Sequence, residues 1–340
     1  AYYLVETKAP AGYAPRRDRI PFTTEGSGGH VTIDEQPGTI TLRIVKLDAA
    51  TGAGSQAGAS LAGAEFTCVS QSTPGWTQTL TTDENGRATL NDVPLGSFTI
   101  YESKAPEGYL ISNDSWSYTV GADQIGDTGV VELESRIPNI PIAFDLEISK
   151  FKDRGDNDGS GIEQPAEGVV FEVVSNSSQQ VIGTLTTNVY GFASTKDQAD
   201  AWFGAGARVS GAHGAIPYDR AGYTVREVAE TVPEGFKQAG DWTVTVEQIA
   251  DGAELQYIID NHALSTHLQI VKRDAQTGGT VPLAGFTFQL LDSHHEPVSQ
   301  TCWYPAHHFM STFTTDAAGA VTLPESLNPG TYYVREASAK

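Results

Sequence analysis

Apolar and polar residues alternate in many short runs along this 340-residue chain, which is the pattern of half-buried β-strands. One such run occurs four times, with an aromatic residue four positions before a glutamate and an aliphatic residue two positions before it. On a strand these three side chains lie on the same face. The four glutamates are Glu6, Glu102, Glu227 and Glu336. We expect this face to be the core face, where a carboxylate is costly unless it has a partner.

A second repeated run places a lysine on an apolar face. It reads Leu42-Arg-Ile44-Val-Lys46 in its first copy and recurs before Lys150 and Lys272. Each copy is followed by a loop, a strand that begins with small residues, a turn with Asp or Asn and Gly, and then the glutamate strand. Short strands at regular intervals with such turns predict an all-β chain of sandwiches in line, without a helix of ordinary length.

The repeats predict four units. Residues 38–141 and 142–262 contain every strand and are complete sandwiches, whereas residues 263–340 lack the last strand. Residues 1–37 carry only the glutamate strand and a short alternating strand over 31–37, and are the C-terminal part of a preceding domain. This fragment buries too little apolar surface to fold alone, so it completes another domain or docks onto a partner.

Composition narrows the function classes. The net charge of −21 disfavours nucleic acid and anionic membranes as partners. The two cysteines, Cys68 and Cys302, lie in different repeats, so no disulfide scaffold is expected. The sequence shows no secretory signal, transmembrane run or sorting sequence, which leaves a cytosolic protein or a piece of an exported one. We favour the second, because the chain begins and stops inside repeats.

Each complete repeat combines an inward lysine, an inward glutamate and an asparagine on its last strand. The asparagines, Asn139 and Asn261, each precede the lysine of the next repeat by 11 residues. One interpretation is a buried ion pair with a carboxamide, which contributes little net stability. The other is covalent: burial favours a neutral amine and a protonated carboxyl, so that the amine attacks the carboxamide and ammonia leaves.

Three phrases resemble a known family: Lys-x-Asp at 46–48, Leu-Ala-Gly-Ala-x-Phe at 61–66, and a Glu-x-Lys-Ala-Pro-x-Gly-Tyr box at 6–13 and 102–109. They are similar to the collagen-adhesin B-type (CnaB) domains of Gram-positive surface proteins and sortase-assembled pilins. The resemblance implies tandem reversed immunoglobulin-like sandwiches, whose first and last strands are joined by a Lys–Asn isopeptide bond with the box glutamate as catalyst.

By position, the resemblance implies a bond between Lys46 and Asn139 with Glu102, and one between Lys150 and Asn261 with Glu227. The outer copies depart from this pattern. The last repeat has Lys272 and Glu336, but its acceptor would lie beyond Lys340.

In the leading fragment, the position 11 residues before Lys46 is Glu35, so its part in any bond stays open. Residues 13–37 of a second copy could supply the missing strand of the last repeat, although this fragment brings its own glutamate strand.

Two further patterns have weaker support. Asp156, Asp158, Ser160 and Glu167 formally fit a calcium loop, but Pro165 and the place between strands favour a solvated turn, so no cofactor is predicted. Four histidines flank Cys302 and could approach one another in a hairpin. Adjacent histidines on a strand point to opposite faces, so surface histidines are favoured over a metal site. These histidines are His294, His295, His307 and His308.

The leading hypothesis is therefore a structural stalk or pilin segment, outside the cell at the wall or in a pilus. Its partners would be neighbouring domains or subunits of the same fibre and, by resemblance, sortase. The alternative is an adhesin that binds a host or glycan ligand through an exposed aromatic surface at Trp202 or Trp303. We see no nucleophile elbow or phosphate loop, so no enzyme with substrate turnover is predicted. Neither a pilin-motif lysine nor a sorting signal is found, which leaves shaft, tip and monomeric stalk open.

Overall fold

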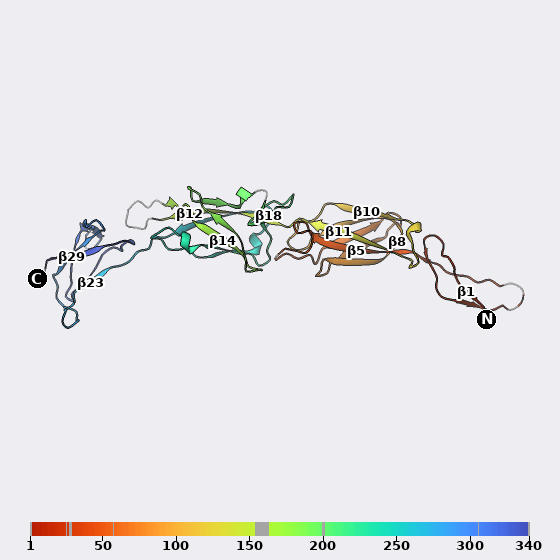
Figure 1. Cartoon of the computed structure of the whole chain (residues 1–340), viewed down its shortest axis with the longest axis horizontal. Coiled ribbons are helices and arrows are strands. Elements are labelled where there is room, and N and C mark those ends of the chain that lie inside the picture. Colours follow the sequence, from red (N-terminus) through yellow and green to blue (C-terminus); the bar gives the residue numbers. More distant parts are fainter. Residues whose placement is uncertain are drawn as a thin grey trace.

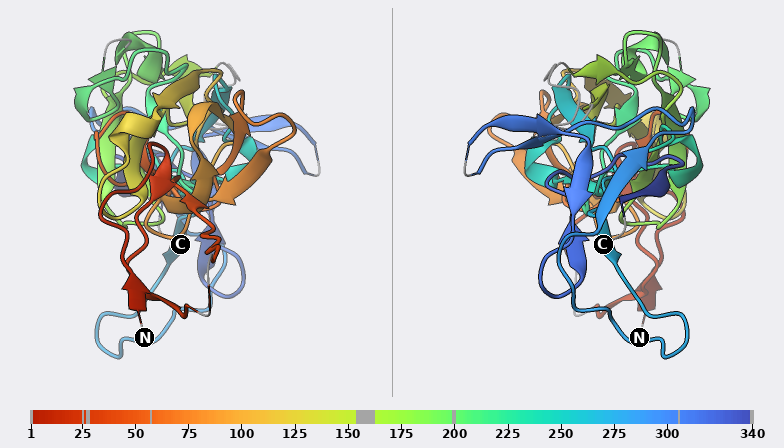
Figure 2. Two further views of the ribbon diagram at one scale, coloured as in Figure 1. Left: turned by 90° about the vertical axis from the view of Figure 1, so that its right-hand side faces the viewer. Right: turned by 90° about the vertical axis from the view of Figure 1, so that its left-hand side faces the viewer.

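The computed structural model describes residues 2–24, 26, 29–56, 58–153, 163–198, 201–304 and 306–338. Its units follow one another along a single long axis, with the two termini at opposite ends (Figure 1). Viewed along that axis, the strands of successive units lie behind one another (Figure 2). The described elements are β-strands and 3₁₀ turns of three or four residues, which confirms the all-β prediction. No described helix has the length and apolar character needed to cross a membrane.

The first complete sandwich has two sheets. One has the order β11-β5-β8, with β11 at Val130–Asn139, β5 at Thr39–Asp48 and β8 at Arg87–Pro94. The other has the order β10-β9-β6-β7, with β10 at Ser115–Val120, β9 at Gly96–Lys104, β6 at Glu65–Ser70 and β7 at Thr77–Thr81. Their inner faces share a core that includes Ile44, Phe66 and Ile100. The first and last strands, β5 and β11, run parallel as neighbours.

The second sandwich repeats this plan. β12 (Ala143–Lys152) pairs in parallel with β22 (Glu254–Asn261), and its other partners are β13 (Gln164–Pro165), β16 (Phe192–Ser194) and β19 (Ile216–Pro217). The facing sheet has the order β15-β14-β20-β21, at Val181–Thr186, Val170–Ser175, Tyr223–Glu227 and Trp242–Val244. An insertion of the second repeat, residues 201–218, contributes a hairpin of β17 (Ala201–Trp202) and β18 (Ala205–Ala207).

Short 3₁₀ turns connect some of these strands. They are η1 (Ala122–Gln124), η2 (Thr195–Gln198), η3 (Ala229–Thr231) and η4 (Val246–Gln248).

The last repeat has a smaller core, built on Leu290, Phe313, Leu323 and Leu327. Its largest sheet has the order β27-β24-β29, at Thr312–Thr314, Thr287–Leu291 and Tyr333–Ser338. Two smaller pairs are β23 (Gln269–Val271) with β28 (Ala320–Thr322), and β25 (Gln300–Cys302) with β26 (His308–Met310).

The leading fragment forms two short antiparallel pairs. These are β1 (Tyr2–Leu4) with β3 (Ile20–Phe22), and β2 (Tyr13–Ala14) with β4 (Gln36–Pro37). The expected strand over 31–37 is therefore wrong except at its last two residues. The expected core face is also wrong for the outer glutamate strands, since Leu4 and Val334 are exposed while Ile100 and Val225 are fully buried.

Candidate functional site

The first centre lies inside the first sandwich, between its two sheets. Lys46 comes from β5, Glu102 from β9 and Asn139 from β11, and all three side chains are buried. Side chains two residues apart on a strand lie on the same face. Ile44 and Ile100 are buried in the core, so Lys46 and Glu102, two residues after them, also point inward. Three polar side chains therefore share the apolar core of this sandwich.

The contacts of this centre orient the carboxamide. The Lys46 amine donates a hydrogen bond to Asn139 Oδ1 and lies 3.2 Å from Glu102 Oε1. Asn139 Nδ2 donates to both Glu102 oxygens, at 3.0 and 2.8 Å. Glu102 thus contacts both the amine and the amide nitrogen, while the amide oxygen faces the lysine.

Burial sets the protonation of the lysine. Desolvation lowers the pKa of Lys46 from 10.5 to about 8, although the Glu102 carboxylate acts in the opposite direction. The aromatic ring of Phe66 lies 5.6 Å from the amine and helps to exclude water. A larger fraction of Lys46 than of an exposed lysine is therefore a neutral nucleophilic amine near neutral pH.

Two main-chain groups complete the centre. Leu110 O accepts a hydrogen bond of 2.8 Å from Asn139 Nδ2, and Ser112 N donates one of 2.7 Å to Glu102 Oε2. Both belong to the segment directly after the box. We did not predict them, because main-chain groups leave no residue pattern in the sequence; only their fixed distance after the box could have indicated them.

The second centre has the same parts in a looser arrangement. Lys150, Glu227 and Asn261 are buried, and the amine lies 3.5 Å from Glu227 Oε1. Asn261 Nδ2 donates to Glu227 Oε2 and to Lys237 O, both at 2.9 Å, and Ala239 N donates to the same carboxylate at 2.7 Å.

Two features distinguish this centre from the first. Asn261 Oδ1 is buried without a hydrogen-bond partner among the described residues. Burial lowers the pKa of Lys150 as it does that of Lys46, but here Asp260 opposes the shift in addition to the box glutamate Glu227.

The outer copies are incomplete within the described chain. Lys272 forms an ion pair with Glu336 at 3.0 Å, and both side chains are partly exposed. Glu6 accepts a hydrogen bond of 2.5 Å from Arg16 N, which repeats the contact of Ser112 N with Glu102. Glu35 has one buried oxygen with no hydrogen-bond partner among the described residues. No described lysine contacts Glu6 or Glu35.

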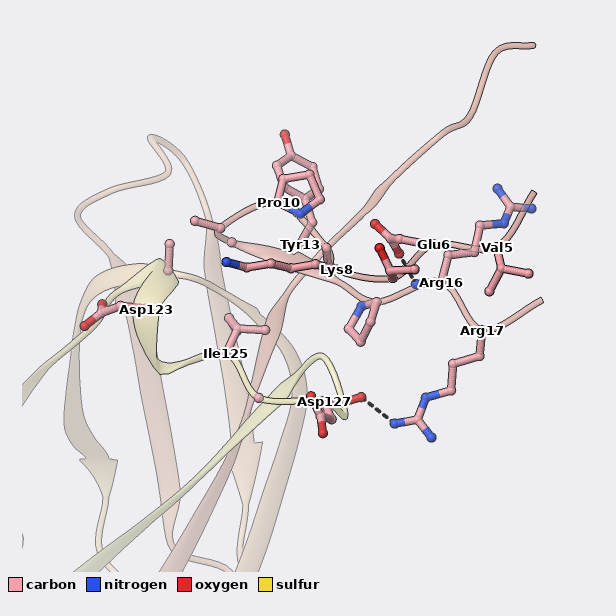
Figure 3. A pocket seen from close by; sticks show the side chains of 17 residues that line it. Val5, Glu6, Lys8, Pro10, Tyr13, Arg16, Arg17, Asp123, Ile125 and Asp127 are labelled. Atoms are coloured by element: carbon pink, nitrogen blue, oxygen red, sulfur yellow. Dashed lines mark hydrogen bonds between the residues drawn. The ribbon is translucent and has the colours of Figure 1, made fainter. Parts of the chain in front are cut away.

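A cleft of 1040 Å³ lies apart from both centres. It separates the box of the leading fragment from residues 122–127 of the first sandwich. Figure 3 shows Lys8 and Ile125 on facing sides, and Arg17 donates a hydrogen bond of 2.6 Å to Asp127 O across one end. The cleft is thus a joint between two units.

The other candidate sites are only partly placed. Asp156, Asp158 and Ser160 lie outside the described residues, and Glu167 is exposed. No group of three or more His, Cys, Asp and Glu side chains with metal-binding geometry is found in the described part of the chain. The His307 ring contacts the rings of Trp303 and Phe309, tilted to the first and edge-on to the second, with centroids at 4.6 and 5.4 Å.

The two candidate tryptophans have different surroundings. Trp303 is 74% exposed. Trp202 is 9% exposed and packs with Ala143 and Ala212, so its expected surface role is wrong. The insertion that carries Trp202 folds back onto β12, which a local sequence pattern does not reveal.

Comparison with known structures gives several similar chains. The Bacillus anthracis TIE protein is 20% identical over 90% of this chain, with a TM-score of 0.47. The present chain spans 46% of the length of that protein. BcpA, the major pilin subunit of Bacillus cereus, is 15% identical over 88% of each chain, with a TM-score of 0.35. GBS52, the minor pilin of Streptococcus agalactiae, is 16% identical over 69% of this chain and 100% of its own, with a TM-score of 0.30.

Comparison with curated protein sequences gives no match. Two segments, 41–134 and 266–340, match the family described as SpaA, a prealbumin-like fold domain. The first segment lies in the first complete repeat and the second in the last repeat. Both therefore belong to the SpaA family of prealbumin-like fold domains, and the resemblance to CnaB-type domains is confirmed.

Proposed function

We propose that each complete repeat closes its own Lys–Asn isopeptide bond, and that the chain is a stalk or pilin segment stiffened by these bonds. The observation that carries this proposal is the first centre. There the Lys46 amine contacts the Asn139 carboxamide while Glu102 contacts both partners, in a site that excludes water. A purely structural ion pair would not require an asparagine at the third position.

The reaction balances without a cofactor. The neutral Lys46 Nζ attacks Asn139 Cγ, while Glu102 contacts both the attacking nitrogen and the amide nitrogen Nδ2. Glu102 then carries a proton from the attacking nitrogen to Nδ2. Ammonia leaves with the former amide nitrogen, and an N–C bond replaces the one that breaks. Leu110 O holds Nδ2 at the start of this sequence. The centre turns over once.

The position of the bond supports a mechanical role. β5 and β11 are the first and last strands of the sandwich and lie side by side. A bond between them carries tension directly from one to the other, so the intervening strands are not pulled out. Elongated repeats with such bonds are suited to a stalk outside the cell at the wall or in a pilus. Adjacent repeats or subunits and, by the CnaB resemblance, sortase are the proposed partners.

Intact-protein mass spectrometry tests the proposal. Each bond removes one ammonia, so each complete repeat should weigh about 17 Da less than its sequence predicts. Tandem spectra should also contain a branched peptide that joins Lys46 to Asn139. An unmodified intact mass would contradict the covalent proposal and leave the buried ion pair as the explanation.

A second candidate function is ligand binding by the last repeat. Its support is the exposed hairpin β25–β26, on which His307 contacts both Trp303 and Phe309. Exposed aromatic clusters of this kind are enriched at binding sites. A screen of the whole chain against host glycans and proteins tests it: binding lost in Trp303→Ala supports an adhesin, and binding that persists removes this hairpin as the site.

A further inference from the structure

The loop that ends each box also holds the linker to the next repeat. In three successive joints, the carbonyl of the box glycine, or of Gly235 in the matching Pro-Glu-Gly-Phe segment at 233–236, accepts a hydrogen bond from the linker. The pairs are Gly38 N to Gly12 O at 2.8 Å, Ile142 N to Gly108 O at 2.9 Å, and Leu264 N to Gly235 O at 2.8 Å. The three glycines have φ values of +87°, +86° and +86°, so the loops have the same local shape. The box therefore has a second role as a joint.

The joint between the first and second sandwiches has an additional partner. Tyr218, which follows β19 in the insertion, donates from its main-chain nitrogen to Ile142 O at 2.8 Å. The linker is therefore hydrogen-bonded on both edges, by Gly108 of one repeat and by Tyr218 of the next. The Tyr218 ring also covers Gly108, where an added Cβ would lie 2.5 Å from ring atom Cδ1.

Polar contacts lock this arrangement. The Tyr218 hydroxyl donates to Glu107 Oε1 at 2.8 Å, across the joint. Burial and Glu107 raise the pKa of Tyr218 to about 12, so the hydroxyl keeps its proton at physiological pH. Arg220 Nε donates to Gly58 O of the first sandwich at 2.9 Å, and its guanidinium lies 3.9 Å from Glu107.

The second sandwich holds these residues from inside. Asp219, between Tyr218 and Arg220, is fully buried. Its carboxylate accepts hydrogen bonds from Ser175 Oγ at 2.5 Å, from Ala221 N at 2.9 Å and from Ser177. Tyr218 and Arg220 are thus fixed to the body of the second sandwich while their side chains contact the first.

The next joint lacks this partner at the matching position. In the antiparallel register that pairs Phe144 with Ile216, Ile142 lies opposite Tyr218. In the register that pairs Thr266 with Leu327, Leu264 lies opposite Pro329. Proline has no N–H group, so Pro329 cannot repeat the bond of Tyr218. Its ring is 3.8 Å from the place where a Gly235 Cβ would lie. At the joint before the first sandwich, a Gly12 Cβ would lie 3.3 Å from Ala122 Cβ and 3.8 Å from Leu95, beside the 1040 Å³ cleft.

We propose that the residue facing the box glycine sets the stiffness of each joint, so that Tyr218 fixes the first and second sandwiches relative to each other while Pro329 leaves the following joint flexible. The insertion of the second repeat is then an interface between repeats. This replaces its predicted role as an exposed contact surface, and it does not depend on the isopeptide bonds.

Pulsed dipolar spectroscopy on the whole chain tests the proposal. The background carries Cys68→Ser and Cys302→Ser. Spin labels at exposed Thr79 and Thr184 span the Tyr218 joint between the first and second sandwiches. Labels at Thr184 and Ala317 span the Pro329 joint between the second sandwich and the last repeat. We expect a narrow distance distribution across the Tyr218 joint and one at least twice as broad across the Pro329 joint. Equal widths at the two joints would overturn the proposal.

Two variants probe the lock from opposite sides. The double variant Tyr218→Ala, Arg220→Ala should broaden the distance distribution across the Tyr218 joint and leave the one across the Pro329 joint unchanged. Glu107→Ala changes only an exposed side chain of the first sandwich, so it should fold normally and still broaden the same distribution. The matched control is Arg226→Ala, which removes an exposed ion pair with Glu172 within the second sandwich. An unchanged width in Glu107→Ala together with an unchanged width in the double variant would contradict the lock.

Discussion

Asn139 is in register with Asp48, two residues beyond Lys46 on the neighbouring parallel strand. Asn261 has the same relation to Lys152 and Lys150. Residues two apart on a strand share a face, and a lysine side chain is long enough to reach along the strand by that distance. A shift of the pairing by one residue would turn the asparagine to the outer face. The parallel register is therefore a requirement of the centre.

Replacing Glu102 with alanine should abolish bond formation in the first repeat only. The substitution removes the group that contacts both Lys46 and Asn139, whereas the Glu227 centre is untouched. After correction for the substitution, the intact mass should rise by about 17 Da, the mass of one retained ammonia. Glu132→Ala is the control, because this exposed carboxylate lies on the strand that carries Asn139 and contacts Arg43. A mass that stays low in Glu102→Ala would exclude Glu102 as the catalyst.

The rate of the first bond should depend on pH through Lys46. Its pKa is lowered to about 8, so the reactive neutral amine increases about tenfold per pH unit below that value and changes little above it. Chain purified unfolded and refolded at pH 6, 7, 8 and 9, followed by timed mass spectrometry, measures the rate. A rate that falls as the pH rises from 6 to 8 would show that the neutral lysine is not the nucleophile.

The first bond should stabilise its sandwich strongly. Lys46 and Asn139 are 93 residues apart. A cross-link that closes a loop of this length lowers the conformational entropy of the unfolded chain, which raises the free energy of unfolding by about 4 to 5 kcal/mol. Lys46→Met removes the bond without burying an unpaired ammonium. Denaturant unfolding should show that the free energy of unfolding of the first sandwich falls by about that amount. A loss below about 1 kcal/mol would be the cost of a repacked side chain alone.

The two tryptophans should behave oppositely. Trp202 is buried against Ala143 and Ala212, so Trp202→Ala should destabilise the second sandwich by about 3 to 5 kcal/mol. Trp303 is 74% exposed, and Trp303→Ala should change stability by no more than about 0.5 kcal/mol. Thermal unfolding of both variants decides this. Equal losses would mean that the hairpin of Trp303 is packed in solution.

The parts of the centres that side chains provide could be predicted from alternation alone, because Lys46, Glu102 and Asn139 each occupy the apolar face of a strand. The main-chain groups of Leu110 and Ser112 could not, since every residue type carries the same carbonyl and amide. The burial of Trp202 was also missed. It depends on contact between Trp202 and Ala143 of β12, which are 59 positions apart in the sequence. Such long-range packing has no local periodicity.

The adjacency of β5 and β11 also bears on resistance to proteases. With a Lys46–Asn139 bond in place, a peptide bond cut in the exposed loop at residues 71–75 does not separate the chain, because both fragments stay joined through the cross-link. The same holds for an exposed loop between Lys150 and Asn261. A nicked molecule would migrate as one species in a denaturing gel even after reduction. Outside a cell, where damaged protein cannot be replaced in place, such a chain keeps its continuity after cleavage.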